Sequence, residues 1–429
     1  RKGATMQFIK TPVKGMSDML PADMRLREHV LSMVKSTYAS FGFMQVETPM
    51  MEHIENLTSK QGGDNEKLIF KVLKRGRDLE RALASDPETL VEALADNGMR
   101  YDLTVPLARY YANNKDKLPS PFKALQIGNV WRADNPQKGR FRQFTQCDID
   151  ILGDKTNLAE IELITATATM LSQIFSEIGL SEFTIHINDR EILRAAALAA
   201  GFAEEDIDAV LISLDKFDKI GFDGIRAELV GNGYDPTVVD SYLALYEQAA
   251  EGIDCASFSA NLGTDALDAR VVSNIAEIIE CTQGMVPTGV SIVYDPTLVR
   301  GMGYYTGPIF EITLDGYNSS VAGGGRYDKM IGKFCGEDVC ACGFSIGFER
   351  IIAVLKDHLP EGFGLAQEAT AFLISDKASL ESKMSTFERA RALRETGAIA
   401  TVLPMKKNLK NQIKHLEAEG YTTFEKIYE

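Results

Sequence analysis

Apolar positions along the chain follow two spacings, one typical of helices and one of strands. Between residues 157 and 179, apolar side chains recur every three or four positions, for example at Ile164, Ala168 and Leu171, and Gly179 follows as a stop signal. This spacing predicts a long helix that packs on one face of a sheet.

Strand patterns surround a charged loop in the first half of the chain. Residues 124–131 and 141–152 are rich in apolar, aromatic and β-branched side chains with partial alternation. The tip between them, residues 135–139, contains Pro and Gly, which favour a turn. The pattern predicts two antiparallel strands joined by an open loop.

The order of elements predicts an α+β protein of several domains. Residues 190–284 are rich in Ala, Leu and acids with helical periodicity, and residues beyond 364 read strand, helix, strand, helix. A chain of 429 residues is also too long for one ordinary core. We expect a catalytic core in two parts, 1–189 and 285–362, a helical insertion domain at 190–284, and a partial α/β domain at 368–429.

Composition and charge exclude several classes of protein. Apolar residues make up 45% and charged residues 25%, as in soluble globular proteins. No apolar run reaches the roughly 18 residues that span a membrane, and the first residues lack the apolar core of a secretory signal. The net charge of −15 argues against sequence-blind binding of nucleic acid. We therefore expect a cytoplasmic or organelle-matrix protein without a membrane partner.

The six cysteines are scattered and do not form a recognisable metal site. Cys335, Cys340 and Cys342 lie close together, but no second cluster completes four ligands and no His has suitable spacing. We expect reduced thiols.

Positive charge is concentrated in the loop between the two predicted strands, next to three acids. The cations are Arg132, Lys138, Arg140 and Arg142, and the acids are Asp134, Asp148 and Asp150. The planar donors of an arginine suit the oxygens of a phosphate, and the carboxylates suit an ammonium group or a metal. The alternative is a solvated hairpin with surface ion pairs.

Two further segments have residues that suit a bound ligand. Asp102 and Thr104 lie two apart, so on a strand they share one face and suit an amine; they suit a helix cap equally well. Arg300, Tyr304 and Tyr305 suit a phosphate and an aromatic ring together. The alternative for this second group is a hairpin with a surface Arg and core tyrosines.

The charged hairpin resembles motif 2 of class II aminoacyl-tRNA synthetases, and GRFRQFTQCDIDILG resembles its histidyl-tRNA synthetase version. The resemblance implies that Arg132 grips the ATP α-phosphate, that Phe144 stacks on adenine, and that the 135–139 loop approaches the tRNA acceptor end. It also implies that Gln146 and Asp150 line the histidine pocket.

Three other segments carry the same resemblance in the family's order. The segment RGMGYYTG resembles the histidine signature RGLDYYTG, with Gly303 in place of the usual Asp, and implies that Arg300 approaches the α-phosphate opposite Arg132. The segment CGFSIGFERI resembles motif 3 and implies that Arg350 packs on ATP. The helix, strand and Pro49 near the start resemble motif 1, which implies a homodimer.

The resemblance implies a fold and two sets of binding residues. The fold is the class II antiparallel sheet flanked by helices. Implied ATP-binding residues are Arg132, Asp134, Arg140, Phe144 and Arg350, with Arg132 and Arg300 catalytic. Implied histidine-binding residues are Asp102, Thr104, Gln146, Asp150, Arg300, Tyr304 and Tyr305.

The implied activity is a histidine–tRNA ligase that forms histidyl-adenylate from ATP and histidine and then esterifies tRNA(His). ATP is a substrate, Mg²⁺ is expected with it, and the sequence shows no ligands for the metal. One alternative is the histidine-binding regulatory paralogue of ATP phosphoribosyltransferase, which has no catalytic activity. Another is a synthetase-like sensor of uncharged tRNA, but such sensors belong to kinase chains and no kinase motif occurs here.

Overall fold

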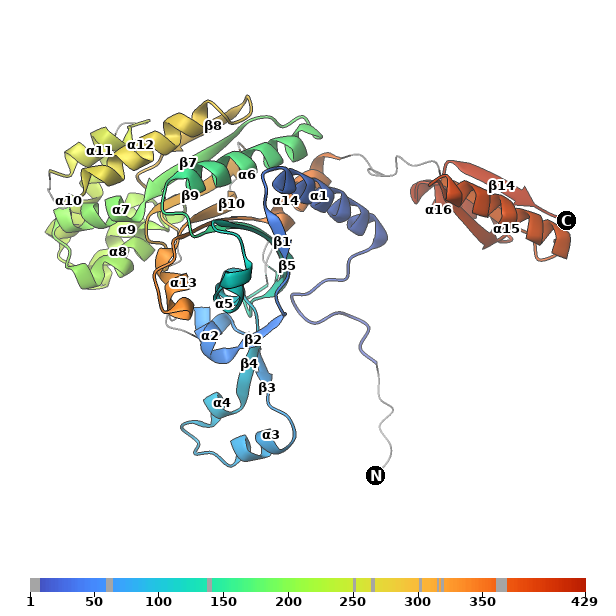
Figure 1. Ribbon diagram of the computed structural model, residues 1–429, viewed down its shortest axis with the longest axis horizontal. Coiled ribbons are helices and arrows are strands. Elements are labelled where there is room, and N and C mark those ends of the chain that lie inside the picture. The colour runs from blue at the N-terminus through green and yellow to red at the C-terminus, as the bar shows by residue number, and fades with distance from the viewer. Residues whose placement is uncertain are drawn as a thin grey trace. The chain divides into compact units, whose positions relative to one another are not determined.

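The chain folds into two compact units. The computed structural model describes residues 8–58, 65–136, 141–249, 252–263, 267–300, 303–314, 316–317, 320–359 and 369–429. Unit 1 comprises Arg1–Ser17 and Met33–Ala353, and unit 2 comprises Asp18–Ser32 and Val354–Glu429 (Figure 1). Helices α1 (Pro21–Ser40) and α14 (Phe348–His358) contribute residues to both units. The finer division into four parts stays a prediction.

Unit 1 is built on a sheet in which eight described strands are hydrogen-bonded. Their spatial order is β1 (Met44–Val46), β5 (Phe122–Trp131), β6 (Gln143–Leu152), β11 (Ala341–Ile346), β10 (Ser320–Arg326), β9 (Pro308–Leu314), β7 (Phe183–Asp189) and β8 (Val290–Tyr294). The six inner strands run antiparallel, and each edge strand runs parallel to its neighbour. The predicted α+β fold with an antiparallel sheet is confirmed.

One alternative that the sequence left open is wrong. Strands β8 and β9 follow each other in the chain, but they do not form a hairpin, because β7 lies between them in the sheet. The segment that contains Arg300 is therefore a crossing connection, since it leaves the edge strand β8, passes β7 and enters the sheet at β9, two positions further in.

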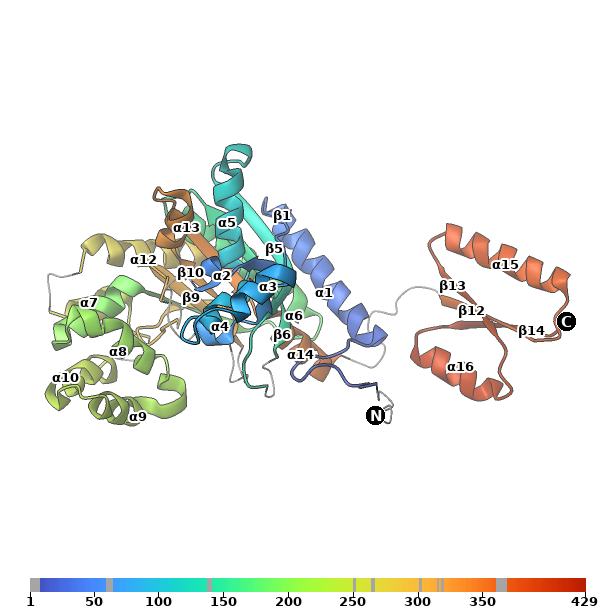
Figure 2. The ribbon, with the colours of Figure 1, turned by 90° about the horizontal axis from the view of Figure 1, so that it is seen from below.

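Helix α6 (Leu158–Ser176) packs against β6 and β11 (Figure 2). Ile164, Ala168 and Leu171 are fully buried, as their spacing predicts. In the described residues α6 is the one helix that is long and apolar enough to cross a membrane, which corrects the expectation that no such run exists. Because 61% of its apolar window is buried inside the protein, α6 has the burial typical of a core helix.

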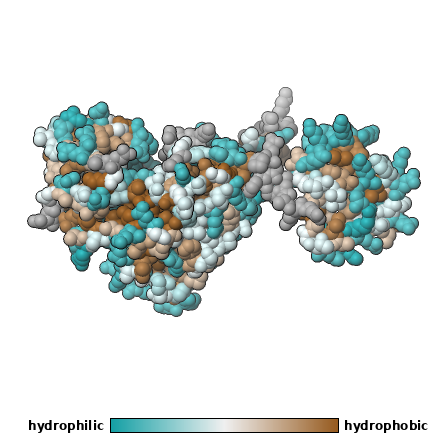
Figure 3. Space-filling model, turned by 90° about the horizontal axis from the view of Figure 1, so that it is seen from above, coloured by the Kyte–Doolittle hydropathy of each residue, from teal (hydrophilic) through white to brown (hydrophobic). Residues whose placement is uncertain are grey.

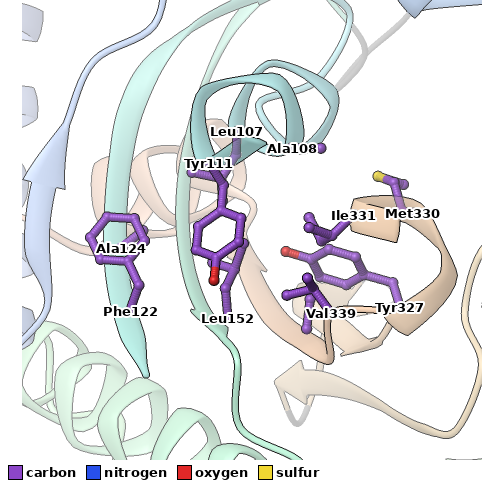
Figure 4. Close-up of a cluster of buried hydrophobic side chains, with 11 residues drawn as sticks. Leu107, Ala108, Tyr111, Phe122, Ala124, Leu152, Tyr327, Met330, Ile331 and Val339 are labelled. Atoms are coloured by element: carbon purple, nitrogen blue, oxygen red, sulfur yellow. The ribbon is translucent and has the colours of Figure 1, made fainter. Parts of the chain in front are cut away.

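A second buried cluster joins the sheet to α5 (Thr104–Asn114) and α13 (Asp328–Cys335) (Figure 4). Leu107 and Tyr111 of α5 pack with Phe122 of β5, and the rings of Tyr111 and Phe122 stack with centroids 6.4 Å apart. Tyr327, just before α13, belongs to the same cluster. This packing fixes the ends of two segments that carry predicted site residues.

A small three-stranded sheet is formed by the segment between β1 and α5. Its order is β2 (Met51–His53), β4 (Ala95–Met99) and β3 (Lys71–Leu73). The helices associated with it are α2 (Ile54–Thr58), the 3-10 helix Asn65–Leu68, α3 (Gly76–Leu83) and α4 (Leu90–Ala93). Pro49 lies between β1 and β2.

In the described part of the segment 190–284 the regular elements are all helices. It contains α7 (Arg190–Ala200), the 3-10 helix Glu204–Asp206, α8 (Ile207–Leu214), α9 (Phe217–Gly231), α10 (Pro236–Glu247), α11 (Cys255–Asn261) and α12 (Ala269–Gln283). Four of these helices begin at an Asp whose carboxylate accepts a backbone N–H hydrogen bond, namely Asp189, Asp235, Asp254 and Asp268. Part of the acidity of this segment is therefore helix capping.

Unit 2 contains a parallel three-stranded sheet in the order β13 (Ile399–Pro404), β12 (Ala369–Ile374), β14 (Thr423–Ile427). Helices α15 (Leu380–Glu395) and α16 (Leu409–Ala418) join its strands. The sequence predicted the first four of these elements in order and missed β14.

The surface mixes hydrophilic areas with apolar patches, as one face shows in Figure 3. Met44, Met50 and Met51, in and between β1 and β2, are exposed large apolar side chains. They lie in the segment that resembles motif 1, and the homodimer stays a prediction.

Candidate active site

A cavity of about 700 Å³ opens in unit 1 over the middle of the large sheet. It collects side chains from segments that lie far apart in the sequence. The predicted site residues that line it are Asp102, Thr104, Arg132, Asp134, Phe144, Gln146, Asp150, Arg300, Tyr304, Tyr305 and Arg350. Arg140, with residues 137–139 of the loop, lies outside the described residues.

One register line crosses six strands, and its four middle residues form the floor of the cavity. Directly opposed residues on neighbouring strands are Gln126, Asp148, Ser345, Gly323, Glu311 and His186, from β5 to β7. Opposed residues share a face of the sheet. Gln146 and Asp150 lie two residues to either side of Asp148 on β6, so they share that face too.

At one end of the floor, which we call the acidic end, burial raises the pKa values of Asp148 and Asp150. Burial raises the pKa of Asp150 to about 7, while the hydroxyl of Tyr327, which donates a hydrogen bond of 2.5 Å to Asp150, opposes the rise. Burial also raises the pKa of Asp148 well above its usual range, and the neighbouring carboxyl of Asp150 adds to the effect. The hydroxyl of Ser345 donates to Asp148 at 2.5 Å.

Two buried acceptors in this end have no hydrogen-bond partner among the described residues. They are Oε1 of Gln146 and Oδ2 of Asp150. The amide nitrogen of Gln146 donates to Ser345 at 3.2 Å, which leaves its oxygen free. Because an unpaired buried acceptor costs free energy, this end of the cavity suits a ligand with N–H donors.

Asp102 and Thr104 do not share a strand face, which corrects that part of the prediction. Strand β4 ends at Met99, and α5 starts at Thr104. Asp102 lies in the connection and accepts a hydrogen bond of 3.1 Å from the backbone N–H of Val105, so the helix-cap alternative is the right one. Burial raises the pKa of Asp102, and both residues still line the cavity.

Arg132 and Phe144 lie together at the other end of the cavity. The guanidinium of Arg132 lies 5.0 Å from the centroid of the Phe144 ring, and its Nε donates to the carbonyl of Tyr101 at 2.9 Å. These contacts hold a cation beside an aromatic face. Such a pair suits a ligand that has both an anionic group and a planar ring.

Arg300 has a fixed place on the floor. Its Nη1 forms an ion pair with the carboxylate of Glu311. A Cβ atom added at Gly323 would lie 2.4 Å from Cζ of Arg300, so the guanidinium packs directly on the bare backbone of β10. Any other residue at position 323 would move Arg300.

Three tyrosines surround the acidic end. The ring centroids of Tyr304 and Tyr305 are 4.7 Å apart, and those of Tyr304 and Tyr327 are 6.0 Å apart. A Cβ at Gly303 would meet no atom within 4 Å. The space at this position therefore does not require a glycine, and the placement of the tyrosines does not depend on its lack of a side chain.

Arg350 lies near the start of α14 and donates from Nη1 to the carbonyl of Ser320. Beside it, Glu349 accepts a hydrogen bond of 3.1 Å from the backbone N–H of Thr145, which ties α14 to β6. Both side chains line the cavity. No group of three or more His, Cys, Asp and Glu side chains suited to a metal occurs in the described part of the chain.

Sequence reasoning missed several residues that line the cavity. They include Asp215, Lys219, Glu311, Tyr327 and Ser345. Glu311 and Ser345 could have been found by aligning the predicted strands, because both point to the face that holds Asp148. Asp215 and Lys219 come from the helical segment, and no local pattern signals their role. The ring nitrogens of His186 lie 3.0 Å from the Asp295 carboxylate and 3.0 Å from the Thr313 hydroxyl.

An antiparallel sheet that brings three arginines, buried acids and aromatic rings into one cavity defines a class II aminoacyl-tRNA synthetase fold. Solved structures agree. A histidyl-tRNA synthetase from Nostoc sp. PCC 7120 matches with a TM-score of 0.76 and 25% identity, over 96% of this chain and 90% of that chain. A Bacillus halodurans C protein described as an ATP phosphoribosyltransferase regulatory subunit/histidyl-tRNA synthetase has the same TM-score at 21% identity, over 99% and 100% of the chains, and shows the fold.

Sequence comparison identifies the family within this class. The family model for histidyl-tRNA synthetase matches residues 15–351, and the chain belongs to that family. A histidine–tRNA ligase from Leifsonia xyli subsp. xyli is 44% identical over 96% of this chain and 94% of its own length. One from Phocaeicola vulgatus is 33% identical over 93% and 88%.

Proposed function

We infer that the protein is a histidine–tRNA ligase. In the first step a carboxylate oxygen of histidine attacks the α-phosphorus of ATP, and the bond to the bridging oxygen breaks as pyrophosphate leaves. In the second step a ribose hydroxyl at the 3′ end of tRNA(His) attacks the carbonyl carbon, and AMP leaves. The observation that carries the proposal is one cavity that combines arginines for phosphate with unpaired acceptors for an N–H donor.

Arginines stabilise the negative charge of the phosphates in the first step. Arg132 and Arg300 contact the α-phosphate from opposite sides and stabilise the charge that develops as pyrophosphate leaves. Arg350 packs on ATP, and adenine stacks on Phe144, whose ring already faces Arg132 at 5.0 Å. Asp134 and Arg140 complete the nucleotide contacts.

Histidine binds at the acidic end. Asp102 and Thr104 hold its α-ammonium group, and buried Asp102 supplies the charge. The free Oε1 of Gln146 and Oδ2 of Asp150 accept from N–H donors of the substrate, which supports their assignment to histidine. Tyr304 and Tyr305 contact the imidazole. Catalysis then depends on position and charge, and no protein group forms a covalent bond.

Magnesium enters with ATP in this proposal. Mg²⁺ usually binds through one or two carboxylates and the substrate phosphates, so a preformed cluster of ligands is not needed. Glu349, which lines the cavity next to Arg350, has a carboxylate suited to this role. The metal would neutralise phosphate charge. We further propose a cytoplasmic homodimer that uses the surface around β1 and β2.

The regulatory paralogue is the weaker alternative. The relative at 44% identity is named a histidine–tRNA ligase, whereas the structure whose title includes a regulatory subunit is 21% identical. A regulator also has no need for Arg132, Arg300 and Arg350, all of which line the cavity.

Histidine-dependent exchange of labelled pyrophosphate into ATP tests the proposal. The wild type should support exchange with histidine alone among the amino acids, and Arg300→Ala should lower the rate by about a hundredfold or more. Arg81→Ala, at an exposed position of α3, is the matched control and should behave as the wild type. Histidine binding without exchange in the wild type would favour the regulatory alternative.

A further inference from the structure

Ser345 lies in the middle of a hydrogen-bonded row on the floor of the cavity. It is directly opposed to Asp148 across the β6–β11 pair, and its hydroxyl donates a hydrogen bond of 2.5 Å to Asp148 Oδ1. The same hydroxyl oxygen accepts a hydrogen bond of 3.2 Å from the side-chain nitrogen of Gln146. Three side chains from two neighbouring strands are therefore joined in one row.

The register of the sheet brings these three side chains together. The diagonal neighbour of a residue in an antiparallel pair lies about 7–8 Å away, within reach of a long side chain. Gln146 is this diagonal neighbour of Ser345, because it lies two residues before Asp148. On their other sides, Gln146 is opposed to Gly128 and Ser345 to Gly323, and a glycine has no side chain that could bind them instead. Ser345 is therefore placed to hold the amide of Gln146.

The single proton of the Ser345 hydroxyl determines the direction of the hydrogen bonds in this row. A hydroxyl group has one donor, and Ser345 uses it for Asp148, so its oxygen can only accept from Gln146. The NH2 end of the amide must then face Ser345, and the oxygen end must face the other way. A carboxyl group that is protonated on Oδ2 still accepts on Oδ1 and keeps the same direction.

The opposed residue on β5 does not compete for the proton of Ser345. This residue is Gln126, which faces Asp148 from the other side. Its amide nitrogen donates to the carbonyl of Leu103 at 3.0 Å, and its oxygen lies 3.5 Å from the hydroxyl of Thr48. Because both ends of that amide are occupied, Asp148 remains the acceptor for Ser345.

We propose that Ser345 is a positioning residue that orients the amide of Gln146 and thereby helps to select the substrate. The two ends of an amide have nearly the same shape, so packing does not distinguish them, whereas the hydrogen bond to Ser345 does. Oε1 of Gln146 is buried and has no hydrogen-bond partner among the described residues. Ser345 therefore presents this oxygen to the substrate as an acceptor.

The orientation of the amide decides which substrates fit. A substrate with an N–H donor at this point satisfies Oε1 of Gln146, and the donor of Ser345 stays with Asp148. A substrate with an acceptor there leaves two acceptors facing each other without a donor, which costs free energy. Without Ser345, the amide could turn and present its NH2 end instead, so the distinction between the two kinds of substrate would be lost.

The inference rests on the proposed function, because histidine supplies the N–H donor. We would measure equilibrium binding of labelled histidine and pyrophosphate exchange in the wild type, Ser345→Ala, Gln146→Ala and the double variant. Ser345→Ala should raise Kd for histidine about fivefold, which corresponds to one hydrogen bond. Since the effect is on binding, kcat and KM for ATP should change less than about twofold, whereas a general disturbance of the site would change them too.

The double variant tests whether Ser345 acts through Gln146. In the Gln146→Ala background, Ser345→Ala should change Kd for histidine less than about twofold, because coupled residues are not additive. Ser241→Ala is the matched control and should bind histidine as the wild type does. It removes an exposed serine hydroxyl of α10 that donates to the carbonyl of Thr237.

Three outcomes would overturn the inference. They are an unchanged Kd in Ser345→Ala, an equal loss in both Gln146 backgrounds, and tighter binding in Ser345→Ala, which would mean that the hydrogen bonds run in the opposite direction. A wild type that shows no histidine-dependent exchange would instead refute the proposed function.

Discussion

The hydroxyl of Tyr327 donates a hydrogen bond of 2.5 Å to Asp150 Oδ1, although 177 positions separate the two residues in the chain. The other carboxylate oxygen, Oδ2, has no partner among the described residues. Tyr327 therefore fixes the orientation of the carboxylate and leaves one oxygen available to a ligand. This arrangement leads to the first prediction.

Tyr327→Phe should weaken histidine binding. Without the hydroxyl, the carboxylate of Asp150 loses its orientation, and its pKa rises further because the hydrogen bond favoured the charged form. We expect KM for histidine to rise about tenfold, which corresponds to a hydrogen bond to a charged group, while KM for ATP changes little.

Pyrophosphate exchange at pH 7.5 measures this effect. Tyr111→Phe is a suitable control, because Tyr111 packs in the same buried cluster without a hydrogen bond to Asp150. Equal effects of the two substitutions on KM for histidine would contradict the assigned role of Tyr327.

Asp150→Asn should stabilise the substrate-free protein at alkaline pH. Since the pKa of Asp150 is about 7 in the folded protein and 3.8 in the reference state, the native protein binds an extra proton between these values. The wild type therefore loses stability as the pH rises from about 4 to about 7, and the neutral variant does not. We expect a gain of about 4 kcal/mol at pH 8.

Urea unfolding at pH 4.5 and pH 8 measures the difference between variant and wild type. That difference should be larger at pH 8, and other titrating acids cancel in the comparison. A difference that does not change with pH would show that Asp150 is ionised at both values.

Gly323→Ala should displace Arg300. The added Cβ would lie 2.4 Å from Cζ of the guanidinium, so the side chain has to move and its pair with Glu311 has to adjust. We expect kcat for pyrophosphate exchange to fall about a hundredfold. Gly284→Ala is the control, since a Cβ there meets nothing within 4 Å, and full activity of Gly323→Ala would refute the packing argument.

Glu160→Gln should destabilise the fold. Arg326 and Glu160 form an ion pair of 2.6 Å, and their side chains are 11% and 1% exposed. Loss of the Glu160 charge leaves the buried Arg326 with a single, longer ion pair to Asp328 at 3.3 Å, and we expect a cost of about 3 kcal/mol of unfolding free energy. Chemical denaturation checks this value. Arg226→Met breaks the exposed pair with Asp240 and should leave the midpoint unchanged.

The sequence was most informative where one segment contains a whole pattern. The strand pair that carries Arg132, Phe144 and Gln146 was predicted to within about two residues, because β-branched alternation and a Pro-Gly loop are local signals. The spacing of apolar residues likewise predicted α6. For the site, resemblance of short motifs supplied many of the residues that line the cavity, but not Glu311, Tyr327 or Ser345.

The features that the sequence did not predict depend on contacts between residues that lie far apart in the chain. Asp102 caps a helix because α5 begins at Thr104, and two residues of sequence do not distinguish this from a strand. The partner of Asp150 lies 177 positions away. Asp215 enters the cavity through the placement of a whole helix pair, which is a property of tertiary packing.

The register line from Gln126 to His186 also has a consequence for how activity arises during folding. It requires six strands drawn from the span between residues 122 and 346, and each must pair before the line is continuous. Long-range pairing of this kind is slow and occurs late, because loop closure precedes any gain from contacts. During refolding, helices such as α6 should therefore regain their circular dichroism signal before any catalysis is measurable. The time at which adenylate formation recovers would then show when the last pair of strands forms.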